Sequence, residues 1–461
     1  MSWGSADDLN RTGKILIDQG KAADPGEAER FLSQLVLQIA VGPDLEHNRA
    51  AQAALATAVN VGWRAFHGGV RVCLDTDPPL QAGWTDGHAA SAVVARYGGT
   101  VVDQLRGDLP TVVIGDPHDP VGWPVLYCTW GGWTGGIVES PDRRLDGPGI
   151  IPAGILAGAL GVSEIFQQAL GNPVPGRREV GISLWCPDQD WRSATAGPKL
   201  EYLPATLWLL GLGHLGQAYA WTLRMLPYAN PGEVEIGLLD FDTVIKGNTA
   251  TQLLVGPDDI GSRKTRVVSA ALEQVGLGTR IVERPFDASF HPEAHAVPTR
   301  NEPRNALAGF DDVTPRRELE SAGFDRVVDV GLGAGPHEYL DMLVHTFPAV
   351  ESPATAFEED PPPPRVTLKP AYESEIARQV EGGIEESAAR CGLLDFAHVT
   401  VGAAFVGAIA STVAVADILR LLHGGNDYSL VALDLRAPNQ LTAVLNTKPG
   451  ADPPPPYTAA A

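Results

Sequence analysis

Residues 203–226 read LPATLWLLGLGHLGQAYAWTLRML, and residues 234–271 read VEIGLLDFDTVIKGNTATQLLVGPDDIGSRKTRVVSAA. In this stretch the apolar run 207–210 leads into three glycines with the spacing G-x-G-x-x-G: Gly211, Gly213 and Gly216. An amphipathic segment and a second apolar run follow. This order predicts a strand, a tight turn, a helix and a second strand. A nucleotide phosphate is expected at the start of the helix, where unpaired N–H groups and the helix dipole favour negative charge.

The residues after the glycines narrow the class of nucleotide, because nicotinamide, flavin and adenylate binders share the glycine spacing. The second apolar run ends at Asp240 and Asp242, and it is followed by Asn248, Gln252 and a DIG-x-x-K segment that ends at Lys264. This combination strongly resembles the ThiF/MoeB family of ubiquitin-activating-type adenylyltransferases. The resemblance is dense across this stretch and weaker elsewhere in the chain.

The resemblance implies an α/β fold with a Rossmann-like, ThiF-type adenylation domain, and it implies ATP and Mg²⁺ as cofactors. It also implies roles for single residues. Asp240 would hold the ribose, Asn248 and Gln252 would line the phosphate side, and Lys264 would contact the phosphates. For Asp242 we expect hydrogen bonds to loop amides rather than to substrate.

Three positions depart from the family pattern. Thr251 stands where the family has an arginine, Leu332 stands where it has a metal-binding aspartate, and His214 replaces a phosphate-loop glycine. We therefore assign no metal ligand. His214 is expected either to touch a phosphate or to make a backbone hydrogen bond in the loop, and we favour the second. Another arginine could stabilise phosphate charge, and the candidates are Arg49, Arg64, Arg263 and Arg266.

Cys391 follows Arg390 just before a long apolar segment and is a candidate nucleophile. A helix N-terminus and a neighbouring arginine both lower the pKa of a thiol. The alternative is a buried small hydrophobe, as unpaired cysteines often are. The four cysteines lie far apart and form no C-x-x-C pair, which argues against a zinc site. Few cysteines and an N-terminus without an apolar signal core favour a cytoplasmic protein.

The charge balance limits the partners. The chain has 461 residues, of which 56 are acidic and 34 basic, and its net charge is −22. Such a charge disfavours nucleic acid and anionic membranes as partners, and it fits a basic or neutral protein. Residues 399–416 carry no charge, but they are rich in Gly, Ala, Ser and Thr. We therefore expect a buried helix there rather than a membrane span.

Four parts are expected along the chain: a polar helical segment at 1–45, a first α/β domain at 46–195, the nucleotide-binding adenylation domain at 200–445 and a Pro-rich tail at 446–461. The first domain has no G-x-G-x-x-G motif. A helix is expected at 48–66. Apolar runs bounded by turn residues predict strands at 70–77, 111–116, 125–130, 324–330 and 430–436.

A weak internal repeat links the two halves. Residues 154–171 read GILAGALGVSEIFQQALG, residues 407–424 read GAIASTVAVADILRLLHG, and a shift of 253 positions aligns them. One interpretation is two unrelated buried helices that each end at a glycine. The other is a tandem pair of related domains, a pseudo-dimer in which the first copy has lost its phosphate loop and is inactive. An assembly of several chains remains compatible with either interpretation.

Three functional hypotheses follow, in order of preference. The first is a bacterial, ATP-dependent adenylyltransferase that activates the C-terminal carboxylate of a ubiquitin-like or other small protein, followed by thioester transfer at Cys391 in a conjugation or sulfur-transfer pathway. The second is a nucleotide-binding scaffold without catalysis. The third is an NAD-dependent oxidoreductase, which the glycine motif and Asp240 allow but the DIG-x-x-K segment does not support.

Overall fold

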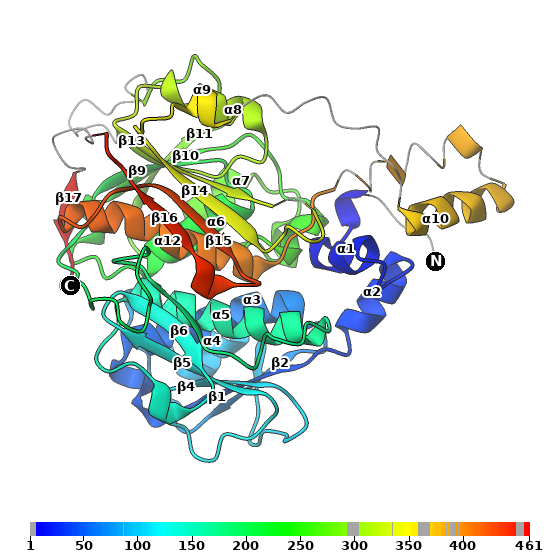
Figure 1. Cartoon of the computed structure of the whole chain (residues 1–461), viewed down its shortest axis with the longest axis horizontal. Helices are drawn as coiled ribbons and strands as arrows, with labels where there is room; N and C mark the ends of the chain where they lie inside the picture. Colours follow the sequence, from blue (N-terminus) through cyan, green and yellow to red (C-terminus); the bar gives the residue numbers. More distant parts are fainter. Residues whose placement is uncertain are drawn as a thin grey trace.

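A computed structural model represents the chain. It describes residues 6–85, 87–292, 304–333, 335–357, 369–383, 399–448 and 456–461, together with 385–387, 389, 393, 394 and 397. Each half of the chain forms one β-sheet, and a layer of helices lies between the two sheets (Figure 1). The mixed α/β, Rossmann-like fold expected for the nucleotide-binding half is confirmed.

The first sheet has seven strands in the order β3-β2-β1-β4-β5-β6-β7. The first five in this order are parallel: β3 Gly99–Val101, β2 Val70–Leu74, β1 Leu37–Val41, β4 Thr111–Ile114 and β5 Val125–Gly131. The last two are antiparallel: β6 Thr134–Val138 and β7 Val180–Ser183. The strands predicted in this half are present. β1, however, lies inside the segment expected to be only helical, and it is buried along its whole length.

The second sheet has eight strands in the order β11-β10-β9-β12-β13-β14-β15-β16. Its parallel strands are β11 Gly278–Val282, β10 Glu235–Leu239, β9 Thr206–Leu210, β12 Asn305–Ala308 and β13 Arg326–Leu332. Its antiparallel strands are β14 Asp341–Phe347, β15 Tyr428–Asp434 and β16 Thr442–Leu445. The first seven positions repeat the chain order and the strand directions of the first sheet.

Four long helices fill the space between the sheets: α3 Arg49–Ala65, α5 Ile151–Ala169, α6 His214–Met225 and α12 Ala404–Leu422. α5 packs on α3, and α12 packs on both α6 and α5. α12 is long and apolar enough to cross a membrane, but 89% of its most apolar window is buried inside the protein. This agrees with the buried helix expected from the sequence.

The other described α-helices are α1 Arg11–Asp18, α2 Pro25–Leu32, α4 Ala90–Arg96, α7 Lys264–Glu273, α8 Val313–Arg317, α9 Pro353–Ala356 and α10 Pro370–Glu381. Asp24 caps α2 by accepting from the Glu27 N–H. The Pro-rich tail contains a short strand that the sequence did not predict. Its strand β17, Tyr457–Ala459, pairs with β8, Tyr202–Pro204, at the junction between the halves.

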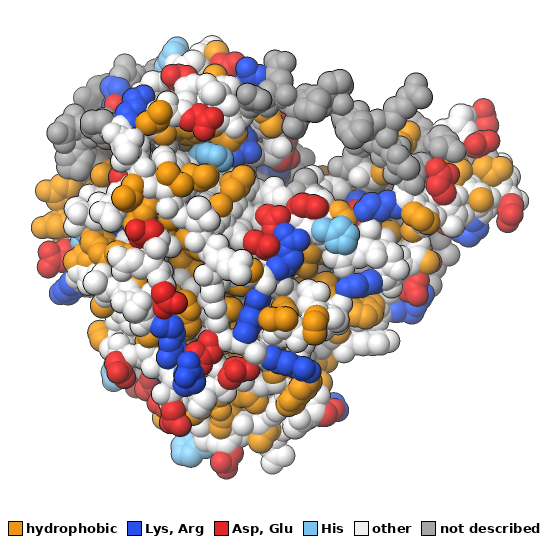
Figure 2. Space-filling view, in the orientation of Figure 1, with side chains coloured by type: hydrophobic (Ala, Val, Ile, Leu, Met, Phe, Trp, Pro, Cys, Tyr) orange, Lys and Arg blue, Asp and Glu red, His pale blue; other side chains and the backbone are white. Residues whose placement is uncertain are grey.

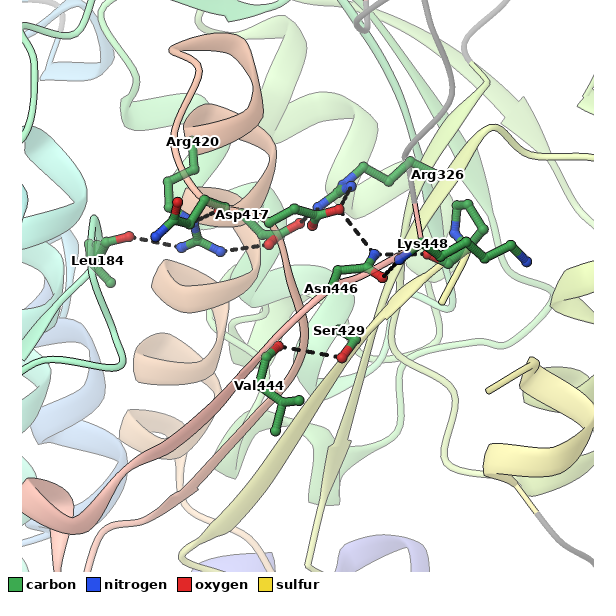
Figure 3. Close-up of polar contacts among 11 residues, drawn as sticks. Leu184, Arg326, Asp417, Arg420, Ser429, Val444, Asn446 and Lys448 are labelled. Carbon is green, nitrogen blue, oxygen red and sulfur yellow. Dashed lines mark hydrogen bonds and ion pairs between the residues drawn. The ribbon is translucent and has the colours of Figure 1, made fainter. Parts of the chain in front are cut away.

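A buried ion-pair network joins the halves at α12 (Figure 3). Asp417 accepts hydrogen bonds from Arg326 on β13 and from Arg420 one turn along its own helix. Arg420 also donates from Nη1 to the backbone carbonyl of Leu184 in the first half, at 2.8 Å. The guanidinium is therefore satisfied only when the two halves are in contact.

Candidate functional site

A cavity of about 570 Å³ lies at the carboxyl ends of the parallel strands of the second sheet. This edge is where open α/β sheets bind their ligands. Seven of the residues predicted from the sequence line the cavity: Gly211, Gly213, Asp240, Asp242, Asn248, Gln252 and Lys264. Gly216 does not line it. The sequence motif therefore converges on one space in the fold.

Each of the three positions of the motif has a glycine for a different physical reason. Gly211 has a φ of +79°, which side chains rarely adopt. A Cβ at Gly213 would meet nothing within 4 Å, so this glycine leaves room on the cavity side. A Cβ at Gly216 would lie 1.9 Å from the carbonyl oxygen of Gly211, so Gly216 lets α6 start against the turn. Its role is packing rather than contact with a ligand.

Asp240 holds the glycine turn. Its Oδ2 accepts from the Leu212 N–H at 2.6 Å, and its Oδ1 accepts from the Asp242 N–H at 2.7 Å. We expected Asp242 to bind loop amides, but Asp240 makes these hydrogen bonds instead. A carboxylate accepts about four hydrogen bonds, so Asp240 keeps capacity for a ribose hydroxyl.

Lys264 begins α7, and its Nζ lies 2.7 Å from Asp242 Oδ2. Its side chain is only 10% exposed, so the cation is held at the cavity wall. Asn248 and Gln252 are anchored beside it. Asn248 Oδ1 accepts from the Ile245 N–H, and Gln252 Oε1 accepts from Gln217.

Arg11 is a site residue that the sequence analysis missed. It lies on α1, lines the cavity and donates from Nη1 to the carbonyl and the hydroxyl of Thr400, at 3.1 and 2.8 Å. Burial lowers the pKa of Arg11, and the charge of Asp311 acts in the opposite direction. Arg11 precedes the glycine motif by about 200 positions, so no local spacing could have revealed it.

The four arginines proposed from the sequence lie elsewhere, and none belongs to the described cavity lining. Arg64 is buried and donates to the carbonyls of Leu253 and Val255. Arg263 and Arg266 bind the Phe241 carbonyl and Glu283. Arg49 lies 3.4 Å from the Ala461 carbonyl. Because none of them reaches the described lining of the cavity, the structure places none of these candidates where the missing arginine would act.

His214 lines the cavity without adding charge to it. Burial lowers the pKa of His214 to about 4, so the ring is neutral near pH 7. Its Nε2 has no hydrogen-bond partner within the described part of the chain. A Cβ at Gly407 would lie 2.4 Å from this nitrogen, so the ring packs on the first turn of α12. His214 therefore joins the phosphate loop to α12.

Cys391 and Arg390 lie outside the described residues, so the predicted nucleophile stays a prediction. The other three cysteines are described as free thiols. Cys73 is half-buried, whereas Cys128 and Cys186 are buried. Burial raises the pKa of Cys128 to about 12, which makes it a poor nucleophile.

Family models described as the BilD C-terminal domain and the BilD N-terminal domain match residues 203–425 and 36–184. The bacterial E1-like protein BilD of Collimonas sp. (strain OK412) is 36% identical over 434 residues, which are 92% of this chain and 90% of that protein. Both halves are therefore similar to one relative along nearly their whole length.

Two solved structures are more distant. E. coli MccB matches 53% of this chain and 63% of its own length, with 14% identity and a TM-score of 0.35. E. coli TcdA, a tRNA N6-threonylcarbamoyladenosine dehydratase, was solved in complex with AMP and matches 47% of this chain and 85% of its own, with 17% identity and a TM-score of 0.29.

Proposed function

Because the chain belongs to the BilD family of bacterial E1-like proteins, we propose that it is a ThiF-like, ATP-dependent adenylyltransferase. Its substrate is the C-terminal carboxylate of a ubiquitin-like or other small protein. One observation carries the proposal. The glycine turn, Asp240 and two cations from distant parts of the chain, Lys264 and Arg11, line a single cavity at the carboxyl edge of the sheet.

In the proposed reaction, a carboxylate oxygen of the partner forms a bond to the α-phosphorus of ATP. The bond to the β-phosphate oxygen breaks, and pyrophosphate leaves with the electron pair. Negative charge grows on the phosphate oxygens, and cations fixed beforehand around the site stabilise it. Lys264 and Arg11 supply such charges, Gly213 leaves room for a phosphate, and Asp240 orients the ribose.

The residues present do not fit a protein-held magnesium ion of the kind that the family resemblance implies. Leu332, a cavity residue without oxygen ligands, occupies the position expected for the metal-binding aspartate. Within the described ranges, no group of three His, Cys, Asp or Glu side chains could hold a metal ion. No step of the mechanism is therefore routed through a protein-held ion. Magnesium that accompanies ATP belongs to the substrate.

A face for the partner lies beside the cavity. Gly331 lines the cavity, and its neighbour across the strand pair is Leu343 on β14. Exposed apolar side chains continue from there over the antiparallel strands and the following turn: Leu343, Val350, Val444 and Leu445. Figure 2 shows hydrophobic side chains on this face of the molecule. A small protein bound there could extend its C-terminus into the cavity.

We propose further that the first half is an inactive copy of the second, so that one chain forms a pseudo-dimer. The shared strand order of the two sheets supports this. The shift of 253 positions also carries α5, Ile151–Ala169, onto α12, Ala404–Leu422, end to end. Both helices are closed by a glycine with positive φ, Gly171 at +90° and Gly424 at +70°.

Reciprocal hydrogen bonds across the helix layer give independent support. Arg420 on α12 donates to the carbonyl of Leu184, which directly follows β7. Gln167, the residue of α5 that corresponds to Arg420, donates to the carbonyl of Leu435, which directly follows β15. A two-fold interface makes such paired contacts.

The acyl-adenylate is then proposed to pass to Cys391. Its thiolate sulfur would attack the activated carbonyl carbon and form a thioester, with AMP as the leaving group. The product serves conjugation or sulfur transfer. The low cysteine content supports a reducing compartment, and we place the reaction in the cytoplasm.

The test is pyrophosphate exchange into ATP with a purified ubiquitin-like protein, sought first among the products of neighbouring reading frames that end in Gly-Gly. Exchange should require the partner and should survive Cys391→Ala, because adenylation precedes thiolate attack. Arg11→Ala should slow it by about a hundredfold or more, since one positioned arginine is worth that much in phosphoryl transfer. The exposed Arg30 on the neighbouring α2 offers a matched control, Arg30→Ala, with unchanged exchange.

Absence of exchange with the true partner and magnesium present, despite ATP binding, would instead assign the fold to a non-catalytic scaffold. Preferential binding of NAD over ATP would favour the oxidoreductase.

A further inference from the structure

A guanidinium from α8 lies beside the end of β13, at the strand end where the family resemblance implies a metal-binding carboxylate. Arg316 lies on α8, directly after the loop that follows β12, and it lines the cavity together with Leu332. Its Nε donates to Asp329 Oδ2 at 2.9 Å, and its Nη2 donates to the same oxygen. The Asp329 side chain is 0% exposed, so this ion pair is built into the strand.

Two further contacts hold the guanidinium in place. The ring of Phe357 lies 4.1 Å from Arg316 Cζ. On the other side, a Cβ at Gly331 would lie 2.9 Å from Nη2 and 3.1 Å from Nη1, so any other residue at position 331 would displace the arginine. The side chain is thus ordered before a ligand binds, which lowers the entropic cost of each new hydrogen bond.

The guanidinium keeps donors for a ligand. It has five N–H groups, and the bonds to Asp329 involve Nε and Nη2. The Nη1 donors remain at the cavity wall. Arginine binds phosphate oxygens by such charge-assisted, often bidentate hydrogen bonds.

The carboxylates around the cavity already have partners within the protein. Asp240 binds loop amides, and Asp242 pairs with Lys264. Asp312 caps α8 by accepting from the Thr314 N–H. Asp311 interacts with the charge of Arg11. Each of these carboxylates therefore already has a contact inside the protein before a ligand binds.

We propose that Arg316 binds the nucleotide phosphates and supplies the charge that a carboxylate-held metal ion would otherwise supply at this strand end. Asp329 is a positioning residue that fixes the plane of the guanidinium. The inference rests on the proposed adenylation, and it assigns the metal position of that site to a side chain. Arg316 neither exchanges a proton nor forms a covalent bond while the adenylyl group is transferred.

The test measures ATP binding by calorimetry in EDTA and in magnesium. Wild-type affinity should change less than about threefold between the two conditions. Arg316→Gln alone would leave the buried Asp329 unpaired, so the informative variant is the double change Arg316→Gln with Asp329→Asn, which replaces the ion pair by two neutral amides. Its affinity should fall about tenfold or more, as expected for a lost charged hydrogen bond. Asp329→Asn alone keeps the cation and most of the affinity.

Arg317→Gln is the matched control, because Arg317 is adjacent and lies outside the described cavity lining. Its ATP affinity should equal that of the wild type. Unchanged affinity in the double variant would overturn the proposal and leave Arg316 a structural residue. The proposal would also be overturned if the ATP affinity of the wild type fell tenfold or more in EDTA and if Asp311→Asn caused the same fall in magnesium. A carboxylate would then hold the metal.

Binding and turnover separate this inference from the proposed function. Weakened ATP binding in the double variant, with no partner-dependent exchange in the wild type, would support Arg316 and reject adenylation. Normal exchange with normal ATP binding in the double variant would reject Arg316 and retain adenylation.

Discussion

Lys264 forms an ion pair with Asp242 at the cavity wall, and its removal should affect nucleotide binding more than stability. Lys264→Ala deletes a cation and leaves the Asp242 carboxylate facing the phosphates. A hydrogen bond between charged groups is worth about 1.5–3 kcal/mol, so the ATP dissociation constant measured by calorimetry should rise roughly 10- to 100-fold. Lys246→Ala removes an exposed lysine outside the described cavity lining and should leave it unchanged. Equal affinity in both variants would contradict the assignment of Lys264.

His214 makes the protein acid-sensitive. Its pKa is about 4 in the folded state and about 6.5 in an unfolded chain, so the unfolded state binds more protons between these values. Stability should therefore be lost as the pH falls from 6.5 towards 4, by about 2 kcal/mol at pH 5 from this group alone. Urea unfolding at pH 7, 6 and 5 should show a smaller loss in His214→Gln. His88→Gln, at an exposed histidine, should lose stability as the wild type does.

Among the single residues of the site, the sequence predicted those that belong to one continuous motif and missed those that distant segments supply. Gly211, Asp240 and Lys264 have fixed spacings that follow from a strand, a turn and a helix. Arg11 and Arg316 carry no such spacing, because tertiary packing alone brings α1 and α8 to the cavity. Roles within the motif also shifted, since Asp240 took the amide bonds expected of Asp242.

Among the elements, the α3–α5 pair depends on close backbone contact. A Cβ at Gly154 would lie 2.1 Å from the Ala50 carbonyl oxygen. Gly154→Ala should therefore push the helices apart and destabilise the protein by about 1–3 kcal/mol, seen as a lower denaturant midpoint. Gly232→Ala is the control, because its Cβ would meet nothing within 4 Å, and we expect a change within about 0.5 kcal/mol. A midpoint for Gly154→Ala equal to that of Gly232→Ala would show that α3 and α5 adjust freely.

Elements with strong periodicity or clear boundaries were predictable, and short ones next to other signals were not. α12 was recognised as a buried helix from its uncharged, small-residue composition. The sequence did not predict β1, because this strand has only five residues and follows two capped helices closely. β17 was missed because strand pairing with β8 across more than 250 positions leaves no trace in a three-residue segment.

For the whole molecule, the contact between the halves should depend unequally on its two reciprocal bonds. Arg420→Leu leaves one oxygen of the buried Asp417 and the Leu184 carbonyl without their donor, which should cost about 3–5 kcal/mol. Gln167→Leu removes two neutral hydrogen bonds, to Ser163 Oγ and to the Leu435 carbonyl, and should cost only about 1–2 kcal/mol. Denaturant midpoints of the two variants test this order. Equal costs would mean that Asp417 keeps its charge satisfied through Arg326 alone.

The walls of the cavity draw on Arg11, on the glycine turn and on Thr400, which span most of the chain. During synthesis on the ribosome, α1 emerges first and its Thr400 contact emerges nearly 390 residues later. The first sheet can form while translation continues, but the cavity cannot close until late. A prematurely terminated product that ends before residue 400 would therefore have the complete first half and an open nucleotide site. Such a fragment would lack α12 and also Val444 and Leu445 of the proposed partner face, so it would neither close the nucleotide site nor present the whole face to a partner.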